Sequence, residues 1–416
     1  MQILKSCSSC SRRDFFRAGI YGLGISAALP TFLRQVSEAQ AAEALTGAVE
    51  KNPNRILVVL ELAGGNDGLN TVVPIENDAY YKARPTIAVR KEEALRVDDH
   101  FGFHQNAKGF EQLYKDGKMA LVHGCGYPDP ILSHFTAMDW WHTATPHGSD
   151  KYGWLGRFAD QYQPEAVQNY ITNIASKEAL AVRSEKHSPV VFNDPKKFLR
   201  LGTEAQQKVF ETYGKVYATN NESLNFLNQV SQTATQGASM VRGACAEYRT
   251  LVEYGSDNNL TLNLKKVAAM INADLPTRIY YLSFGGFDTH AAQKALHDVL
   301  MIYTADAIRG FQEDLERIGR ADDVAMMVFT EFGRRVGENA SGGTDHGTAT
   351  PMFIVGNKVK GGLYGAFPDL NDLDDGNMKF TTDFRSVYAT MLKEWMGFDG
   401  TDKVLKGSYP TLGVFA

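Results

Sequence analysis

Residues 56–62 read Ile-Leu-Val-Val-Leu-Glu-Leu, a nearly unbroken apolar run that leads into the segment Gly64-Gly65-Asn66-Asp67-Gly68. Continuous apolar runs of this length are typical of strands that are buried on both faces of a parallel sheet. Similar runs recur along the chain, at 119–123, 190–192, 279–284, 324–330 and 352–355. Helical patterns lie between them. The sequence therefore predicts an α/β fold, a doubly wound and mostly parallel central sheet with helices on both faces.

The N-terminal segment has the features of an export signal. Arg12 and Arg13 follow Ser11 in a basic leader, an apolar stretch covers residues 18–33, and Ala39-Gln40-Ala41 fits a cleavage site. The apolar stretch is too short and too rich in Gly and Ala to span a bilayer well. We therefore predict a twin-arginine signal peptide over residues 1–41, recognised by the twin-arginine translocation machinery. The mature protein is then periplasmic or extracellular. A retained amphipathic helix is the alternative.

The charge balance excludes some partners. The leader carries five basic and two acidic residues, so the net charge of −5 becomes −8 for residues 42–416. An acidic protein of this kind lacks the electrostatic footprint for nucleic acid or an anionic membrane surface. Cys7 and Cys10 lie in the leader, whereas Cys125 and Cys245 could pair in an oxidising compartment or remain free thiols. The sequence leaves that choice and the oligomeric state open.

The mature chain of about 375 residues shows neither repeats nor a low-complexity linker. We predict one α/β domain over residues 42–416. The region from about 203 to 273 is polar, rich in Ala, Gln and Asn, and lacks a strand candidate. It is predicted to be a helical insertion over the α/β core.

Chemically active side chains cluster at the ends of the predicted strands, and in open α/β sheets the site lies beyond the carboxyl ends of the strands. Four strand ends and one strand entry contribute such side chains: Asp67, Ser133, Asp288 with His290, Glu331 with Arg334 and Arg335, and Asp345 with His346. Carboxylates and imidazoles together suit Zn²⁺, Mn²⁺, Mg²⁺ or Ca²⁺. One or two ions could be held, and two ions can clamp the attacking and leaving oxygens of a displacement at phosphorus or sulfur.

Ser133 and Arg334 are the candidate catalytic residues. A serine hydroxyl is a poor nucleophile at neutral pH and would need metal coordination to become one. Ser133 could also be the N-cap of a helix predicted over His134–Thr143, and the two roles are compatible because a helix N-terminus stabilises negative charge close to it. Arg334 or Arg335 could hold a charged ester oxygen bidentately. A plain surface role is the alternative for both arginines.

These motifs occur in a distinctive order. Six motifs follow one another along the chain: the leader, the Gly-Gly-Asn-Asp-Gly segment, Leu-Ser-His-Phe at 132–135, Phe-Asp-Thr-His at 287–290, Thr-Glu-Phe-Gly-Arg at 330–334 and Gly-Gly-Thr-Asp-His-Gly at 342–347. Together they resemble an exported family of unknown function within the alkaline phosphatase/sulfatase superfamily. The resemblance runs from the leader nearly to the C-terminus and implies an alkaline phosphatase-like fold.

The resemblance also implies roles for individual residues. Asp67 matches the metal aspartate after the first strand, and Ser133 matches the nucleophile. Asp288 and His290 resemble the pair that ligates the other metal, although the superfamily usually spaces them further apart. Glu331 takes the place of an aspartate. Asp345-His346-Gly347 spells the familiar Asp-His-Gly, but its position favours His346 as the late metal histidine.

Two departures from the superfamily pattern limit the prediction. Ser133 is not followed by x-Pro-x-Arg, which disfavours sulfatase chemistry through formylglycine, and Glu331-Phe332 replaces an Asp-His pair, which could weaken one metal position. We predict an exported metal-dependent hydrolase of a phosphate or related ester, acting on a small-molecule or envelope substrate. The alternative is a non-catalytic binding or envelope-assembly protein with a degraded metal site. An exported redox enzyme is disfavoured, because residues 42–416 contain neither C-x-x-C-H nor cluster-forming cysteines.

Overall fold

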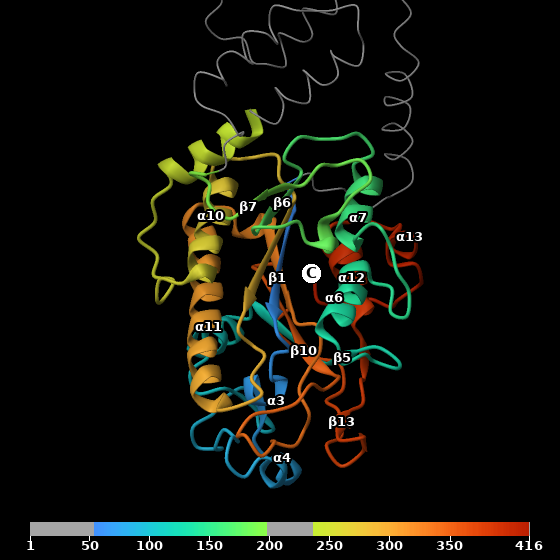
Figure 1. Ribbon diagram of the computed structural model, residues 1–416. Helices are drawn as coiled ribbons and strands as arrows, with labels where there is room; N and C mark the ends of the chain where they lie inside the picture. Colours follow the sequence, from blue (N-terminus) through green and yellow to red (C-terminus); the bar gives the residue numbers. More distant parts are fainter. Residues whose placement is uncertain (1–53, 198–235, 416) are drawn as a thin grey trace, which may run out of the picture. The chain divides into compact units, whose positions relative to one another are not determined.

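The computed structural model describes residues 54–197 and 236–415 (Figure 1). The predicted signal peptide and residues 203–235 of the predicted helical insertion lie outside these residues. Among the described helices, none has the length and apolar character needed to cross a membrane.

A nine-stranded sheet forms the centre, in the order β11-β5-β10-β9-β1-β8-β6-β7, with β14 also paired to β5. β10 runs antiparallel to both of its neighbours, and the other paired strands run parallel. The sheet is therefore mostly parallel, as predicted. Its strands are β1 (Ile56–Ala63), β5 (Met119–Gly126), β6 (Ile171–Ile174), β7 (Val190–Phe192), β8 (Ile279–Gly285), β9 (Val324–Phe329), β10 (Thr350–Val355), β11 (Gly362–Tyr364) and β14 (Thr382–Asp383).

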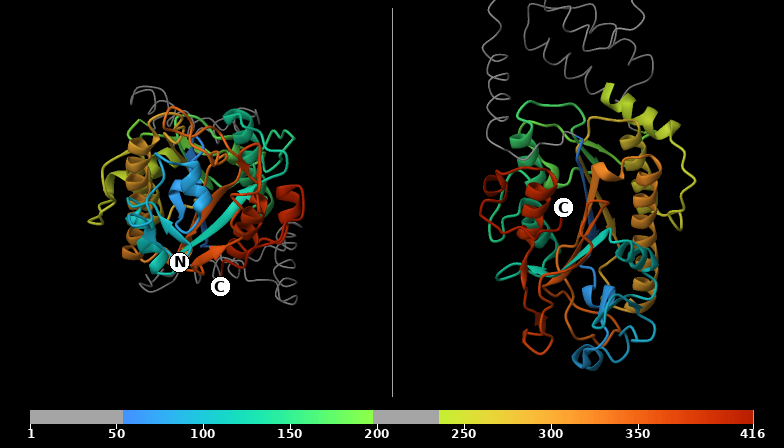
Figure 2. Two further views of the ribbon diagram at one scale, coloured as in Figure 1. Left: turned by 90° about the horizontal axis from the view of Figure 1, so that it is seen from below. Right: turned by 180° about the vertical axis from the view of Figure 1, so that it is seen from behind.

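Helices cover both faces of the sheet (Figures 1 and 2). Side chains alternate along β1, so Val58 and Leu60 pack into a core with α5, α10 and α11, while Leu57 and Val59 pack into a second core with α6, α7, α12 and α13. This arrangement confirms the doubly wound prediction. The helices are α5 (Lys108–Lys115), α6 (His134–Thr143), α7 (Trp154–Tyr162), α10 (Asn259–Asn272), α11 (Gln293–Arg317), α12 (Phe384–Thr390) and α13 (Thr401–Leu405).

Smaller elements surround the lower part of the sheet in Figure 1. A three-stranded sheet joins β2, β4 and β3, and a hairpin joins β12 to β13. Their bounds, with those of the short helices, are α3 (Gly68–Thr71), β2 (Val72–Pro74), α4 (Asp78–Ala83), β3 (Leu95–Arg96), β4 (Phe101–Phe103), η1 (Leu180–Val182), η2 (Ala321–Asp323), β12 (Leu373–Asp374), β13 (Asn377–Met378) and the π-helical turn η3 (Met391–Trp395).

The six predicted strands are all present, and helix α6 begins and ends where predicted. β6 was not predicted, since its four residues Ile-Thr-Asn-Ile are too few and too polar to stand out. Cys125 and Cys245 are free thiols. β9, β1 and β8 are neighbours, with Ala63 of β1 beside Gly285 of β8, so the loops that leave these strands meet at one edge of the sheet.

Candidate metal centre

Two glycines let the loops at this edge approach each other closely. Gly64, directly after β1, has φ +120°, and a Cβ added there would lie 2.5 Å from the backbone nitrogen of Asp288. A Cβ on Gly347 would lie 2.3 Å from the carbonyl carbon of Arg334. Side chains at either position would force the loops apart. The glycines of the two motifs therefore bring Asp288, Arg334 and the Asp345-His346 segment together.

Three imidazoles converge on the carboxylate of Asp288. The Nε2 atoms of His290, His346 and His134 lie 3.0, 3.3 and 3.5 Å from its Oδ1. Nε2 of His290 is also 2.9 Å from Nε2 of His346. One potential ligand atom from each of His134, Asp288 and His346 lies within 4.8 Å of the other two. His134, Asp288 and His346 thus form the candidate ligand group, and Nε2 of His290 lies beside Asp288 and His346.

The opposite nitrogen of each ring is anchored to an oxygen. Nδ1 of His134 lies 2.7 Å from Oε1 of Glu331, and Nδ1 of His346 lies 2.7 Å from the carbonyl oxygen of Leu132. Nδ1 of His290 lies 3.2 Å from Oδ1 of Asp345. Each of these oxygens accepts a hydrogen bond, so the ring hydrogen sits on Nδ1 and the lone pair on Nε2. Metal-binding histidines are oriented by acceptors in this way.

The donor atoms fit a metal ion. Two Nε2 lone pairs 2.9 Å apart cannot bond to each other, and the buried Nε2 of His134 has no hydrogen-bond partner among the described residues. Ligand atoms about 2.0–2.1 Å from a tetrahedral Zn²⁺ lie about 3.3 Å from one another. The separations of 2.9–3.3 Å among Asp288, His290 and His346, and of 3.5 Å between Asp288 and His134, are close to that spacing. Three imidazoles with one carboxylate favour Zn²⁺ or another imidazole-binding ion over Mg²⁺ or Ca²⁺.

Arg334 orients Asp288. Its side chain is buried, and Nη2 donates to Oδ1 of Asp288 at 2.7 Å. Its other donors go to backbone oxygens of Gly64, Gly65, Phe287 and Thr344. Partial burial tends to raise the pKa of Asp288, but the hydrogen bond and charge of Arg334 outweigh it and lower that pKa to about 2. The structure thus gives no support to the predicted contact between Arg334 and an ester oxygen.

Asp67 does not join the three imidazoles. Its Oδ1 accepts hydrogen bonds from the backbone of Leu69 and Asn70 at the start of α3. Its Oδ2 accepts from Nη1 of Arg84 at 2.6 Å and from the side-chain amide of Gln293. Both oxygens of Asp67 are therefore occupied by protein donors.

The remaining predicted residues surround the centre. Glu331 and Asp345 stand behind imidazoles, as described above. Ser133 is the exposed N-cap of α6, and its side chain makes no capping hydrogen bond. It lies in the chain between Leu132 and His134, and the carbonyl oxygen of Leu132 anchors His346. His134 was missed by the sequence analysis. The one feature of the sequence that could have indicated His134 is its place in Leu-Ser-His-Phe, directly after the candidate nucleophile Ser133 at the start of a helix.

The comparisons with known proteins bear on the family. A family model described as a protein of unknown function (DUF1501) matches residues 114–407, well over half of the chain. The chain belongs to the DUF1501 family. No curated protein matches it.

Several solved structures resemble this DUF1501 protein at low identity. The lipoteichoic acid synthase LtaP from Listeria monocytogenes is 9% identical over 89% of this chain and 80% of its own, with a TM-score of 0.42. The C-terminal periplasmic domain of EcEptC from Escherichia coli is 11% identical over 86% and 88%, with a TM-score of 0.39. A protein in the alkaline phosphatase superfamily from Vibrio parahaemolyticus is 10% identical over 84% and 68%, with a TM-score of 0.36. At these values the likeness carries no conclusion about activity.

A cleft of about 770 Å³ opens beside the candidate metal centre of the DUF1501 protein. His134, Asp288 and Glu331 line one part of it. The other walls come from α6 and from the segment around η1, and include Phe135, Met138, Asp139, His142, Leu180 and Arg183. Phe135 is 87% exposed and is available to a ligand.

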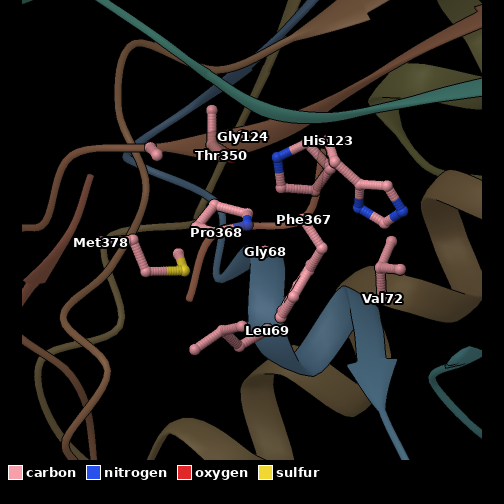
Figure 3. A pocket seen from close by; sticks show the side chains of 11 residues that line it. Gly68, Leu69, Val72, His123, Gly124, Thr350, Phe367, Pro368 and Met378 are labelled. Carbon is pink, nitrogen blue, oxygen red and sulfur yellow. The ribbon is translucent and has the colours of Figure 1, made fainter. Parts of the chain in front are cut away.

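A separate small cavity lies between α3, the end of β5 and β10 (Figure 3). His123, Phe367 and Met378 line it, and it leaves about 10 Å³ for a guest. That is room for one water molecule. The cleft beside the candidate metal centre, and not this cavity, is therefore large enough for a substrate.

Proposed function

We propose that this DUF1501 protein is an exported, metal-dependent hydrolase of a phosphate or related ester. The observation that carries the proposal is the convergence of three Nε2 atoms on Asp288, each ring being held from behind by an oxygen. Such anchoring prepares imidazoles to bind an ion before it arrives. The centre lies beside a cleft of a size usual for ligand sites.

The ion would be held by His134, His290, His346 and Asp288, with Glu331 behind His134. When bound, an ion of this kind supplies Lewis-acid chemistry. The occupied oxygens of Asp67 favour one ion over two. The occupied oxygens of Asp67 also support the second candidate function, that of a non-catalytic binding protein in which a single ion stabilises the fold.

Ser133 is the proposed nucleophile. Ser133 is exposed, its side chain takes no part in capping α6, and it directly precedes His134 and Phe135, which line the cleft. The amino end of α6 would stabilise the negative charge of phosphoryl oxygens that bind next to it. In the proposed reaction the Ser133 hydroxyl gives up its proton and its oxygen forms a bond to phosphorus while the bond to the ester oxygen breaks. The released ester oxygen takes up a proton, and water later cleaves the bond between phosphorus and the Ser133 oxygen, which restores the hydroxyl. Phe135 and Met138 would contact an apolar part of the substrate.

The test uses the chain from residue 42, matured in its own host. Elemental analysis gives the metal content, and chromogenic phosphate monoester, phosphodiester and sulfate ester substrates give the turnover. We expect about one ion per chain, loss of the ion in His346→Ala, and loss of turnover but not of the ion in Ser133→Ala. His100→Gln, at an exposed histidine away from the centre, is the matched control.

Each result has a distinct meaning. Turnover that survives in Ser133→Ala would exclude the nucleophile. A stoichiometric ion without turnover on any ester would favour the binding protein. An ion content that is equal in wild type and His346→Ala would refute the metal centre.

A further inference from the structure

The cleft of about 770 Å³ follows one face of α6 away from the candidate metal centre. Its lining residues on this helix form two rows with a spacing of four positions, which places them side by side: His134, Met138 and His142, and Phe135 and Asp139. His134 belongs to the candidate metal centre, and His142 lies eight residues further on, about 12 Å along the helix axis. The cleft therefore has a long wall beyond the centre.

His142 has an unused ring nitrogen in this wall. Its Nε2 lies 2.7 Å from the hydroxyl oxygen of Tyr281 and 3.3 Å from Oε2 of Glu61. The Tyr281 hydroxyl donates to Glu61, so its oxygen accepts the Nε2 hydrogen of His142. Nδ1 has no hydrogen-bond partner among the described residues, and it is not one of the unpaired atoms that are fully buried. Because His142 is only 7% exposed and lines the cleft, a partner for Nδ1 would lie in the cleft.

The other polar side chains of the wall keep free donors and acceptors. Nε of Arg183 donates to Oε1 of Glu178 at 3.0 Å, whereas the Nη atoms of Arg183 and Oε2 of Glu178 bond to no described residue. The exposed carboxylate of Asp139 also makes no hydrogen bond or ion pair within the part of the chain that the structure describes. The wall thus combines two carboxylates that accept, a guanidinium that donates and one imidazole nitrogen.

These groups distinguish between classes of ligand. Nδ1 of His142 accepts a hydrogen bond in the neutral ring and donates one in the cation, and a hydroxyl group can meet both forms. An anionic group would be repelled by Asp139 and Glu178, and a cationic group by Arg183. Hydroxyl groups both donate and accept, and they meet the carboxylates and the guanidinium without such repulsion.

The apolar part of the wall adds a second requirement. Phe135 is 87% exposed, and Met138 and Leu180 line the same cleft. Covering these side chains with C–H groups of a ligand removes apolar surface from water. We propose that the body of the ligand is a saturated ring rich in hydroxyl groups, a sugar or a cyclic polyol, packed on Phe135 and hydrogen-bonded to the polar side chains of this wall. The inference rests on the proposed function in one respect: the ring would be the alcohol part of the ester.

Four probes share a six-membered carbon ring and differ in their polar groups: myo-inositol, cyclohexanol, cyclohexylamine and cyclohexanecarboxylate. Titrations followed by saturation-transfer NMR, with the chain from residue 42, give the dissociation constants. We expect inositol to bind about tenfold more tightly than each of the other three, the effect of one or two additional hydrogen bonds. No probe carries a phosphate or an ester, so the binding is measured whether or not the protein hydrolyses esters.

Variants on the exposed face of α6 locate the binding. Phe135→Ala removes apolar surface and Asp139→Ala removes a carboxylate, and each should weaken inositol binding about fivefold. Leu251→Ala and Asp369→Ala, at exposed residues outside the lining, are the matched controls and should equal wild type. Since Phe135 and Asp139 are exposed, their variants test the proposal even where His142→Phe fails to fold.

Three results would overturn the inference: inositol that does not bind, another of the four probes that binds as tightly as inositol, or wild-type affinity in either α6 variant. Ester turnover alongside any of them would leave the proposed function intact with a different class of substrate. Selective binding of inositol without turnover of any ester would uphold the inference about the cleft and count against the proposed hydrolase instead.

Discussion

The substitution Glu331→Gln tests whether the imidazoles are held ready for an ion. Oε1 of Glu331 lies 2.7 Å from Nδ1 of His134 and accepts from the backbone nitrogen of Gly64 at 2.9 Å. Oε2 accepts from the hydroxyl of Thr330 at 3.0 Å. The residue is only 2% exposed, so water cannot readily replace a lost partner. Glutamine keeps the shape but offers one oxygen where the carboxylate offers two.

With its oxygen toward His134, the amide turns its NH₂ group to the hydroxyl of Thr330, which can accept because it donates to the carbonyl oxygen of Leu62. The ring then keeps an acceptor, but a neutral amide in place of a carboxylate, so Nε2 becomes a weaker ligand. Mutation of such a partner behind a metal-binding histidine typically lowers metal affinity about 10–100-fold. This corresponds to about 1.4–2.7 kcal/mol. The carboxylate of Asp345 is 56% exposed, and water can replace it behind His290, so Asp345→Asn should weaken binding less than tenfold.

The assay is a competition for Zn²⁺ between the protein and a chromogenic chelator at neutral pH. Affinity should fall in the order wild type, Asp345→Asn, Glu331→Gln. Glu313→Gln, on the exposed side of α11, serves as a matched control and should equal wild type. A Glu331→Gln protein that binds Zn²⁺ as tightly as wild type would refute the idea that Glu331 prepares His134 for the ion.

Three other predictions concern stability and reactivity. Gly64 and Gly319 both have positive φ, so alanine at either site should cost about 1–3 kcal/mol of backbone strain. Of these two sites, only Gly64 also brings the new Cβ into collision with backbone atoms, so Gly64→Ala should lower the free energy of unfolding in urea by more than Gly319→Ala. Equal losses in the two variants would contradict this. Burial tends to raise the pKa of Asp67, but the charge and hydrogen bond of Arg84 outweigh it and lower that pKa. The ionised carboxylate therefore stabilises the fold fully at pH values above about 4, its ordinary pKa, and this stability is lost as the pH falls from there through the lowered pKa of the folded protein. Asp67→Asn should be about 3–5 kcal/mol less stable at neutral pH and less sensitive to acid in urea titrations over a pH series, and an unchanged pH dependence would count against it. Burial raises the pKa of the Cys125 thiol and shields it, so iodoacetamide should label Cys125 only after unfolding, as mass spectrometry of native and denatured protein can check.

The fold could be predicted largely because its strands are buried on both faces. The runs at 56–62 and 324–330 are almost wholly apolar, and apolar runs of this length are typical of strands buried on both faces of a parallel sheet. β6 shows the limit of this signal. Its Thr172 and Asn173 are buried and hydrogen-bonded to neighbouring strands and side chains, and only the assembled sheet supplies those partners.

The candidate site residues that lie directly at strand ends could be predicted from the sequence. Asp288, His290 and His346 follow or precede strands that are near one another in the sheet, and the structure brings them together. Asp67 was predicted to be a metal ligand because it follows β1, but its position in the sequence does not reveal that Arg84 forms an ion pair with it in the folded protein. The role of His134 depends on the direction of α6 relative to the sheet, which is a tertiary property. The export route and the hydrolytic reaction stay predictions.

The centre joins residues that are far apart along the chain. His134 and Glu331 are separated by 197 residues, and Asp288 and His346 by 58. Closing such long loops is slow, because contacts between distant residues form only after much of the chain has been ordered. We therefore expect the imidazoles to meet late in folding. An ion that binds them would slow the unfolding of finished molecules without speeding their formation, since a contact absent from the folding transition state changes the unfolding rate alone.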